Sequence, residues 1–385
     1  MSGWSLFKAA FVFVETQAGW LLAGGLGVAA ILHGFRWWED KRRIRKFAPE
    51  MGEVYNFGET PSVSILLPAW NEADNVGACM ESVLNLRYPN KQLVVCAGGG
   101  DNTLEIAKGY EGQRVIVLEQ RAGEGKQGAL RRCFERATGE VIFLTDADCQ
   151  LDDECFERTL APVIAGREDV TTGSWRPLER QVEHPFVQYQ WAHHIYREVR
   201  LPAYVPTLDG RNAVVRRQAL ETTGAFQGEA PIGTDYVLSK QLTAGGRRIR
   251  FVRQSRVQTG YPETIKAYWK QQSRWFRNPL VLGKRWGERA LALTHLRAGF
   301  AAVFLLAVPM VGGLGSKLLW YPWMAAVCHL ILSQVRLIRF AQLYGGLQLT
   351  PRWRYALFLP YMVIGWIAMA RGLIDSLLPW HRERW

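Results

Sequence analysis

Cysteine is scarce in this chain, and acidic residues are fewer than basic ones. Six cysteines among 385 residues exclude a disulfide scaffold, and none belongs to a CxxC pair, so free thiols in a reducing compartment are favoured over zinc or disulfides. The 35 acidic residues stand against 47 lysines and arginines, which leaves a formal net charge of +12. That excess is compatible with nucleic acid, an anionic membrane surface or a phosphate-bearing substrate. An apolar fraction of 48% excludes a disordered chain.

Charged residues are absent from a long run near the N-terminus. Residues 17–35 contain no Asp, Glu, Lys or Arg, and about 20 apolar residues suffice to span a bilayer. A basic cluster follows at once and marks the cytoplasmic side of a first span: Arg36, Lys41, Arg42, Arg43, Arg45 and Lys46. We therefore predict a transmembrane helix and a basic cytoplasmic linker over residues 1–58. Residues 4–14 either extend that helix or lie in the membrane interface.

The C-terminal part also contains long runs without charge. Residues 298–316, 318–335 and 355–370 have this character, and a buried soluble core is a less favoured explanation for so many runs of this length. The connector before the last run is basic and contains no acidic residue, which indicates the cytoplasmic side: Arg336, Arg339, Arg352 and Arg354. We predict a membrane region of about three helices over residues 289–385. The C-terminal tail is basic, which conflicts with a location outside the cytoplasm. In an alternative arrangement, one of the three C-terminal helices is therefore re-entrant or interfacial.

The middle segment, residues 59–288, has the pattern of a globular cytoplasmic domain. Short apolar runs at residues 63–67, 93–96, 115–118 and 141–144 are rich in β-formers, and helical patterns separate them. Strands that alternate with helices are typical of an α/β fold with a mainly parallel sheet.

Two carboxylates follow the last of these predicted strands. Asp146 and Asp148 form a DxD motif, and the carboxyl ends of parallel strands open onto the ligand crevice of an α/β sheet. Carboxylate oxygens suit Mg²⁺ or Mn²⁺, which usually combine one or two carboxylates with substrate phosphates. Alone, a DxD pair is more often a solvated loop.

Further motifs occur in a fixed order around this pair. The first strand runs into Pro68, Asn71 and Glu72, and a glycine-rich turn brings Lys126 to the start of a helix, a position that favours a phosphate. Asp235 follows a glycine turn at residue 233. A QxxRW motif places Gln271 and Arg274 on one helix face, where Arg can clamp phosphate oxygens and Trp275 can stack on a sugar.

With this ordered set, the sequence resembles the membrane-bound, processive-type glycosyltransferases of family 2 over residues 60–280. The group includes cellulose, chitin, hyaluronan and poly-N-acetylglucosamine synthases and ceramide glucosyltransferases. The resemblance implies a GT-A (Rossmann-like) fold, a nucleotide-diphosphate sugar donor and inversion of the anomeric centre. It assigns the general base to Asp235, the nucleotide ribose or the metal to Asp146, and the metal at the donor diphosphate to Asp148. It assigns the donor diphosphate and the acceptor end to the QxxRW residues.

The sequence departs from this family's pattern after the second strand. The acidic pair that helps to read the nucleotide base is replaced by Cys96 and Ala97, so the glycines that follow, or Asp101, would substitute for it. A uridine diphosphate sugar is the default expectation. Asp209 and Arg211 match the segment that lines the acceptor cavity and are candidate acceptor contacts. The arginine-rich stretch around residues 247–256 is expected to face phospholipid headgroups.

We therefore predict an integral protein of the inner or plasma membrane, multi-pass, with a cytoplasmic catalytic domain. Direct displacement at the anomeric carbon needs a base for the acceptor proton and positive charge near the leaving diphosphate, and it needs no covalent nucleophile. The acceptor is a membrane lipid or a growing polysaccharide, so a non-processive glycolipid synthase remains the alternative. The other expected partners are membrane lipids and a second copy of the chain, which would add helices. Nucleic acid is not an expected partner. A non-catalytic scaffold and a nucleotidyltransferase are less favoured, because the aspartates and QxxRW are present.

Overall fold

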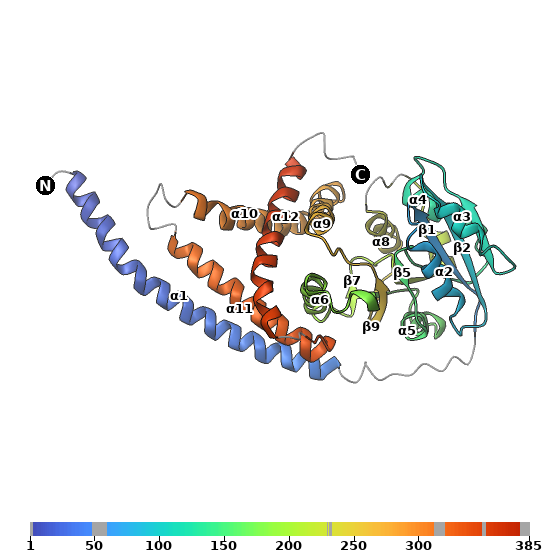
Figure 1. Ribbon diagram of the computed structural model, residues 1–385, viewed down its shortest axis with the longest axis horizontal. Helices are drawn as coiled ribbons and strands as arrows, with labels where there is room; N and C mark the ends of the chain where they lie inside the picture. Colours follow the sequence, from blue (N-terminus) through green and yellow to red (C-terminus); the bar gives the residue numbers. More distant parts are fainter. Residues whose placement is uncertain are drawn as a thin grey trace. The chain divides into compact units, whose positions relative to one another are not determined.

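The computed structural model describes residues 3–47, 60–228, 230, 233–311, 320–348 and 352–377, and it divides into two compact units (Figure 1). The first, which we call the sheet unit, comprises Phe47–Glu183 and Arg197–Tyr261. The second, the helical unit, comprises Met1–Lys46, His184–Tyr196 and Pro262–Trp385. The functional segments predicted at 1–58, 59–288 and 289–385 are not tested by this division and stay predictions.

The predicted strands all form, and they make up the parallel half of one sheet. These are β1 (Val63–Trp70), β2 (Lys91–Gly98), β3 (Val115–Glu119) and β4 (Val141–Leu144), in the order β3-β2-β1-β4. Val63 lies opposite both Lys91 and Val141, so the strands are in close register and their carboxyl ends share one edge. This arrangement confirms the predicted α/β class.

The other half of the sheet is mixed. It contains β5 (Cys149–Gln150), β6 (Val170–Pro177), β7 (Tyr204–Val205), β8 (Ala213–Arg216) and β9 (Ile249–Thr259). β8 runs antiparallel to β4 and β6, whereas β6 and β9 are parallel. The sheet therefore continues beyond β4 with strands that the sequence pattern did not predict.

Helices cover both faces of the sheet. The bounds are α2 (Val76–Leu84), α3 (Thr103–Lys108) and α5 (Asp153–Ile164) on one face, and α4 (Gly125–Arg136), α7 (Arg217–Thr223) and α8 (Thr234–Ala244) on the other. Successive strand residues point to opposite faces, so Ile65 packs in one core and Leu66 in the other. A short 3₁₀ turn, Glu179–Gln181, follows β6. Burial of both faces explains why the central strands are continuously apolar rather than alternating.

The arginine-rich stretch of β9 corrects one prediction. Arg253, only 7% exposed, donates to the backbone carbonyl of Leu201, and Arg256 makes two hydrogen bonds of 3.0 Å to the fully buried carboxylate of Glu198. These arginines hold the segment after α6 (Pro185–Glu198) against the sheet. The prediction that the whole stretch faces headgroups is therefore wrong, because two of its members pair inside the protein.

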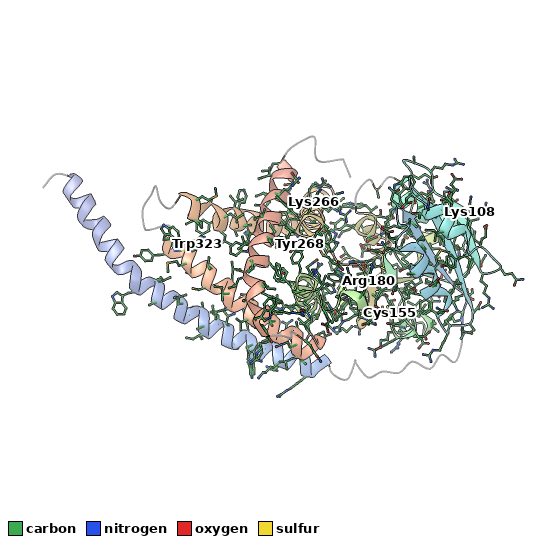
Figure 2. The ribbon with its side chains drawn as sticks, viewed as in Figure 1. Lys108, Cys155, Arg180, Lys266, Tyr268 and Trp323 are labelled. Atoms are coloured by element: carbon green, nitrogen blue, oxygen red, sulfur yellow. The ribbon has the colours of Figure 1, made fainter. Side chains whose placement is uncertain are left out.

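The helical unit contains the long apolar helices. Its members are α1 (Gly3–Phe47), α6, α9 (Ile265–Arg285), α10 (Arg289–Val311), α11 (Trp320–Gly345), a 3₁₀ segment η4 (Arg352–Leu357) and α12 (Phe358–Leu377). Three helices in the described ranges are long and apolar enough to cross a membrane: Ala292–Met310, Trp320–Gly345 and Trp353–Leu377. They match the apolar runs predicted in the C-terminal part. Trp323 of α11, which is labelled in Figure 2, donates a 2.9 Å hydrogen bond to the carbonyl of Leu305 in α10.

α1 is one continuous helix of 45 residues. Residues 4–14 therefore extend the same helix as residues 17–35, and that this helix spans a membrane stays a prediction. Its C-terminal half packs against α11. His33 Nε2 lies 3.0 Å from His329 Nδ1, and Asp40 forms a buried ion pair of 3.2 Å with Arg336.

α6 contacts the rest of the helical unit through His193, which serves as a packing residue. Its Nε2 lies 3.2 Å from Gln334 Oε1 of α11, and its ring meets Tyr189 edge-on. Burial lowers the pKa of His193 to about 4, against an ordinary value of 6.5. The neutral imidazole is therefore the form that the folded protein prefers.

We expect the unfolding temperature to fall as the pH drops from about 6.5 towards 4. In that window the unfolded chain binds a proton at His193 and the folded protein does not, so stability is lost at no more than about 1.4 kcal/mol per pH unit. Thermal unfolding of His193→Gln should show a weaker pH dependence than the wild type. The neighbouring variant His194→Gln is the control, and equal pH dependence in wild type and His193→Gln would contradict this assignment.

Candidate active site

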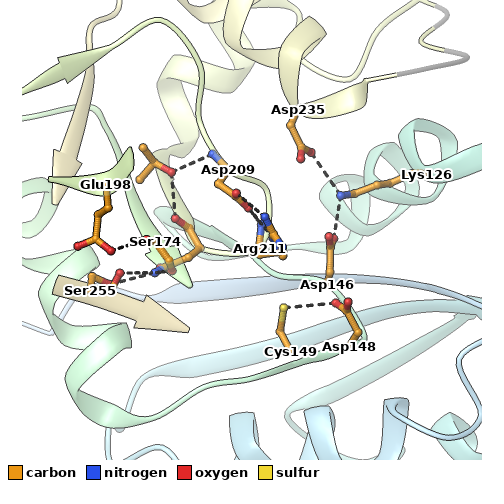
Figure 3. A network of polar contacts seen from close by, with 12 residues as sticks. Lys126, Asp146, Asp148, Cys149, Ser174, Glu198, Asp209, Arg211, Asp235 and Ser255 are labelled. Atoms are coloured by element: carbon orange, nitrogen blue, oxygen red, sulfur yellow. Dashed lines mark hydrogen bonds and ion pairs between the residues drawn. The ribbon is translucent and has the colours of Figure 1, made fainter. Parts of the chain in front are cut away.

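A lysine joins two carboxylates at the edge of the sheet where the parallel strands end (Figure 3). Lys126 Nζ lies 2.8 Å from Asp146 Oδ1 and 3.3 Å from Asp235 Oδ1. The side chains of Lys126, Asp146 and Asp235 are 32%, 27% and 37% exposed, so the cluster opens to solvent. The structure thus brings together three predicted site residues that are up to 109 positions apart in the chain.

Each of these residues is placed by a strand end or by the first turn of a helix. Asp146 follows β4, Lys126 is the second residue of α4, and Asp235 is the second residue of α8. Both helices begin directly at or after a glycine with positive φ, Gly125 at 63° and Gly233 at 64°, a conformation that glycine adopts without strain. The N-terminus of α8 favours negative charge, which suits the carboxylate of Asp235.

Charge and burial shift the pKa values of this cluster. Burial raises the pKa of Asp235 above its ordinary value, and the ammonium of Lys126 only partly opposes this shift. For Lys126, burial would lower the pKa, but the two carboxylates outweigh it and raise the pKa. Lys126 therefore stays protonated, and Asp235 is a stronger base than an ordinary aspartate once it is ionised.

A second group of carboxylates lies beside this cluster. Burial raises the pKa of Asp148, and the nearby charge of Asp146 raises it further. Glu72 has a raised pKa for the same reasons, first burial and then the charges of the aspartates. Such an excess of negative charge suits a divalent cation. No group of three or more His, Cys, Asp or Glu side chains that could hold a metal is found in the described residues. That Asp146 and Asp148 hold a cation together with phosphate or water oxygens stays a prediction.

The loop before β8 contacts the carboxylate of Asp235 directly. A Cβ atom on Gly210 would lie 2.4 Å from Asp235 Oδ1, closer than real side chains approach. The flanking Asp209 accepts hydrogen bonds of 2.9 and 2.8 Å from the guanidinium of Arg211, which also lies 3.7 Å from the ring centroid of Trp175. Asp209 and Arg211 thus neutralise each other and hold the loop, and their role in acceptor binding stays a prediction.

Gly210 and Trp175 are contributions to this site that sequence reasoning did not identify. A glycine between two charged residues looks like any loop glycine, and Trp175 lies in a strand that was not predicted. Only the contact of Gly210 with a residue 25 positions away marks its importance.

The turn after β1 has an unusual backbone conformation, and hydrogen bonds fix two of the predicted site residues, Asn71 and Glu72, in it. Asn71 adopts a positive φ of 56°, and its side-chain oxygen accepts a 2.7 Å hydrogen bond from the backbone N–H of Gly100. The backbone N–H of Glu72 donates to Thr103 Oγ1 at 2.7 Å. Pro68 lies half-buried within β1, next to Cys96 of β2. These contacts join the ends of β1 and β2 into one rigid wall.

Cys96 and Ala97, which replace the family's acidic pair, are fully buried in β2 and cannot reach a ligand. Asp101 accepts hydrogen bonds from Thr103 and from the backbone N–H of Ala73. Asp101 therefore supports the turn after β1, and base recognition by this residue stays a prediction.

The described cysteines are all free thiols, as predicted. Cys149 lies 3.5 Å from the carboxylate of Asp148, and Cys79 lies 3.5 Å from the backbone carbonyl of Asp146. Burial raises the pKa of both thiols, so they pack behind the DxD motif as neutral groups.

The QxxRW residues lie on α9 in the helical unit. Ser273 and Phe276 face inwards, where the Ser273 hydroxyl donates to the carbonyl of Ala368 and Phe276 packs with Leu373. Arg274 and Trp275 are exposed, and Gln271 is partly exposed. The QxxRW motif thus lies on a helix, as predicted, and Gln271 and Arg274 lie on its exposed side. That these three side chains bind donor or acceptor stays a prediction.

Comparison with known proteins places the sheet unit in a family. Residues 64–224 match the model for glycosyl transferase family 2. The beta-monoglucosyldiacylglycerol synthase of Trichormus variabilis is 28% identical over 60% of this chain and 54% of that protein. The poly-beta-1,6-N-acetyl-D-glucosamine synthase of Staphylococcus epidermidis is 25% identical over 56% and 54%. The chain thus spans about half the length of these relatives.

One solved structure that this chain matches is the mannosyltransferase PcManGT from Pyrobaculum calidifontis in complex with GDP-Man and Mn²⁺. It covers 92% of this chain and 99% of its own, with 16% identity and a TM-score of 0.48. The family match confirms the resemblance inferred from the motifs and, with it, the predicted GT-A class. The chain therefore carries a glycosyl transferase family 2 domain.

Proposed function

We propose that the protein is an integral-membrane, inverting glycosyltransferase that moves a sugar from a nucleotide-diphosphate donor to a lipid or growing polysaccharide acceptor. The observation that carries this proposal is the bridge from Lys126 to Asp146 and Asp235. It brings Asp235, the proposed base, together with the ammonium of Lys126 and the first aspartate of the DxD motif, which supports the proposal. The three candidate spans support a membrane location. The basic residues beside the apolar runs support a cytoplasmic side for the sheet unit.

Each residue of the cluster has a distinct task in this proposal. Asp235 takes the proton from the acceptor hydroxyl as its oxygen attacks the anomeric carbon, which inverts that centre. Lys126 stabilises the negative charge of the departing diphosphate. Asp209 and Arg211 hold Gly210 against Asp235 and so keep the base in place. The donor is most simply a uridine diphosphate sugar, by the resemblance to family 2.

A divalent cation, Mg²⁺ or Mn²⁺, fits the carboxylates present. Asp148 and Asp146 would hold it, and it would supply charge neutralisation of the donor diphosphate. Burial raises the pKa of Asp148 and of Glu72, and the charges of the neighbouring aspartates raise both further, which supports such a group there.

Relatives of both acceptor classes exist, since one is named a glycolipid synthase and the other a polysaccharide synthase. The direct test incubates detergent-purified protein with labelled nucleotide sugars and Mn²⁺, followed by mass spectrometry of the product. Release of nucleoside diphosphate together with a glycosylated lipid or polymer supports the proposal. Release of pyrophosphate would indicate nucleotidyl transfer instead, and no release from any donor would indicate a scaffold.

Replacing Asp148 by alanine should weaken donor binding only when metal is present. The reason is that its half-buried carboxylate is expected to reach the diphosphate through the cation. Donor affinity measured by calorimetry with Mn²⁺ and with EDTA tests this expectation in wild type and variant. Asp153→Ala, a half-buried aspartate at the start of α5 that pairs with Arg87, is the control. Equal donor affinity of the wild type with and without metal would contradict the role of Asp148.

Replacing Gly210 by alanine should lower kcat by up to about 100-fold, because a displacement of about 1 Å at a reacting group can cost that much. The added Cβ would lie 2.4 Å from Asp235 Oδ1 and must move the base. Gly112→Ala, where a Cβ would meet nothing within 4 Å and φ is not positive, controls for the loss of a glycine. Wild-type kcat in Gly210→Ala would show that the contact has no catalytic importance.

A further inference from the structure

The helical unit contains a cavity that no part of the proposed reaction uses. It has a volume of about 400 Å³ and lies between α11, η4 and α12. Small-molecule sites usually have volumes of about 300–1,000 Å³, so the cavity is large enough for a ligand. The lining residues that matter here are Val335, Ile338, Arg339, Tyr355, Phe358 and Leu359.

The walls of this cavity are apolar, and they belong to two helices that are long enough to cross a membrane. Ile338 and Phe358 form a buried floor, at 5% and 2% exposure. Val335 and Leu359 are 55% and 42% exposed and border the opening. An apolar groove that opens sideways from membrane-spanning helices meets hydrocarbon rather than water, which suits an alkyl chain.

One end of the groove carries a positive charge. The guanidinium of Arg339 is exposed, and it forms no ion pair or hydrogen bond with the described residues. Tyr355 lies at the same end, where its hydroxyl accepts a hydrogen bond from Gln342. The sequence contains no acidic residue from 318 to 374, whereas the connector adds Arg352 and Arg354. The groove therefore combines an apolar body with a basic end at Arg339.

The depth of Arg339 agrees with a headgroup contact. α11 has 26 residues, so it is roughly 39 Å long and exceeds a hydrocarbon core of about 30 Å. Arg339 lies six residues before the C-terminal end of this helix, within the part that extends towards the basic connector. A long arginine side chain at such a position reaches the phosphate level of the membrane.

We propose that this groove binds one anionic phospholipid of the membrane, with an alkyl chain along Ile338 and Phe358 and the phosphate on Arg339. The site is distinct from the proposed transfer reaction, since its lining includes none of the residues to which that reaction is assigned. The basic end favours an anionic lipid over a zwitterionic one. The apolar body distinguishes the site from a surface that merely attracts headgroups.

The test is native mass spectrometry of the full-length protein in detergent, titrated with phosphatidylglycerol or phosphatidylcholine. We expect the wild type to retain one phosphatidylglycerol at concentrations where phosphatidylcholine is lost. Arg339→Gln should weaken phosphatidylglycerol retention about fivefold, as expected for one arginine at a membrane surface. Arg297→Gln, an exposed arginine on α10, is the matched control and should retain the lipid like the wild type.

Filling the groove provides the second arm. Ala356→Trp and, separately, Val335→Trp should abolish retention of phosphatidylglycerol while the thermal unfolding profile stays that of the wild type. Equal retention of both lipids would overturn the charge-selective site, and unchanged retention in Arg339→Gln and in both filled variants would overturn the site altogether. Retention of detergent alone, or a dimer that excludes lipid, would assign the groove to another occupant and also overturn the proposal.

Discussion

Replacing Asp235 by asparagine is expected to lower kcat by about 10²–10⁴-fold, the usual contribution of a general base, while donor affinity stays close to that of the wild type. Asparagine has nearly the same shape as aspartate but cannot accept the acceptor proton. Asp235 lies 3.3 Å from Lys126 and contacts Gly210. Asparagine fills the same space between these two residues, so the substitution removes only the base. Transfer measured by product formation, and donor binding measured by calorimetry, separate the two effects.

The pH profile provides a further readout for the same residue. Burial raises the pKa of Asp235, so the acidic limb of kcat/KM should lie above the ordinary aspartate value of about 3.9. The sign follows from the role: the base acts only when ionised, and a raised pKa moves loss of activity to higher pH. A collapse of donor affinity in Asp235→Asn would reassign this residue to donor binding. Asp169→Asn, a carboxylate far along the sheet that pairs with Arg247, is the control.

The strands and the DxD motif could be predicted because their signals are local. Each parallel strand is a short apolar run that both faces of the sheet bury, and Asp146 follows directly after one of them. Parallel strands bring their carboxyl ends to one edge, so residues after different strands converge without further information. Lys126 and Asp235 could be predicted for a related reason, since each follows a glycine that starts a helix.

The remaining features depend on contacts between distant parts of the chain. Gly210 matters only because α8 brings Asp235 against it, and Arg256 is buried only because Glu198 lies opposite to it. Likewise α9 follows the sheet in sequence, but Ser273 and Phe276 pack against α12 about 95 residues later. The sequence identifies an arginine as basic and a helix as amphipathic. Whether either one is buried depends on the residues that pack against it in the fold.

Replacing Lys126 by glutamine is the second substitution with a large expected effect. Loss of one fixed positive group at a developing negative charge typically costs about 10²–10³-fold in kcat. In this protein a second consequence follows, because Lys126 also lowers the pKa of Asp235 against the effects of burial and of the neighbouring aspartates. Without the ammonium, Asp235 should hold its proton to higher pH, and the acidic limb of kcat/KM should move upwards relative to the wild type.

The direction of that pH shift distinguishes two tasks of Lys126. If the lysine only binds the diphosphate, Lys126→Gln raises KM and lowers kcat but leaves the acidic limb where it is. If it also tunes the base through the 3.3 Å contact, the limb moves, and the double variant Lys126→Gln with Asp235→Asn loses it entirely. Lys108→Gln, an exposed lysine at the end of α3, should change neither quantity. A limb that moves to lower pH in Lys126→Gln would contradict the electrostatic coupling, since removal of a positive charge cannot make a neighbouring carboxyl group more acidic.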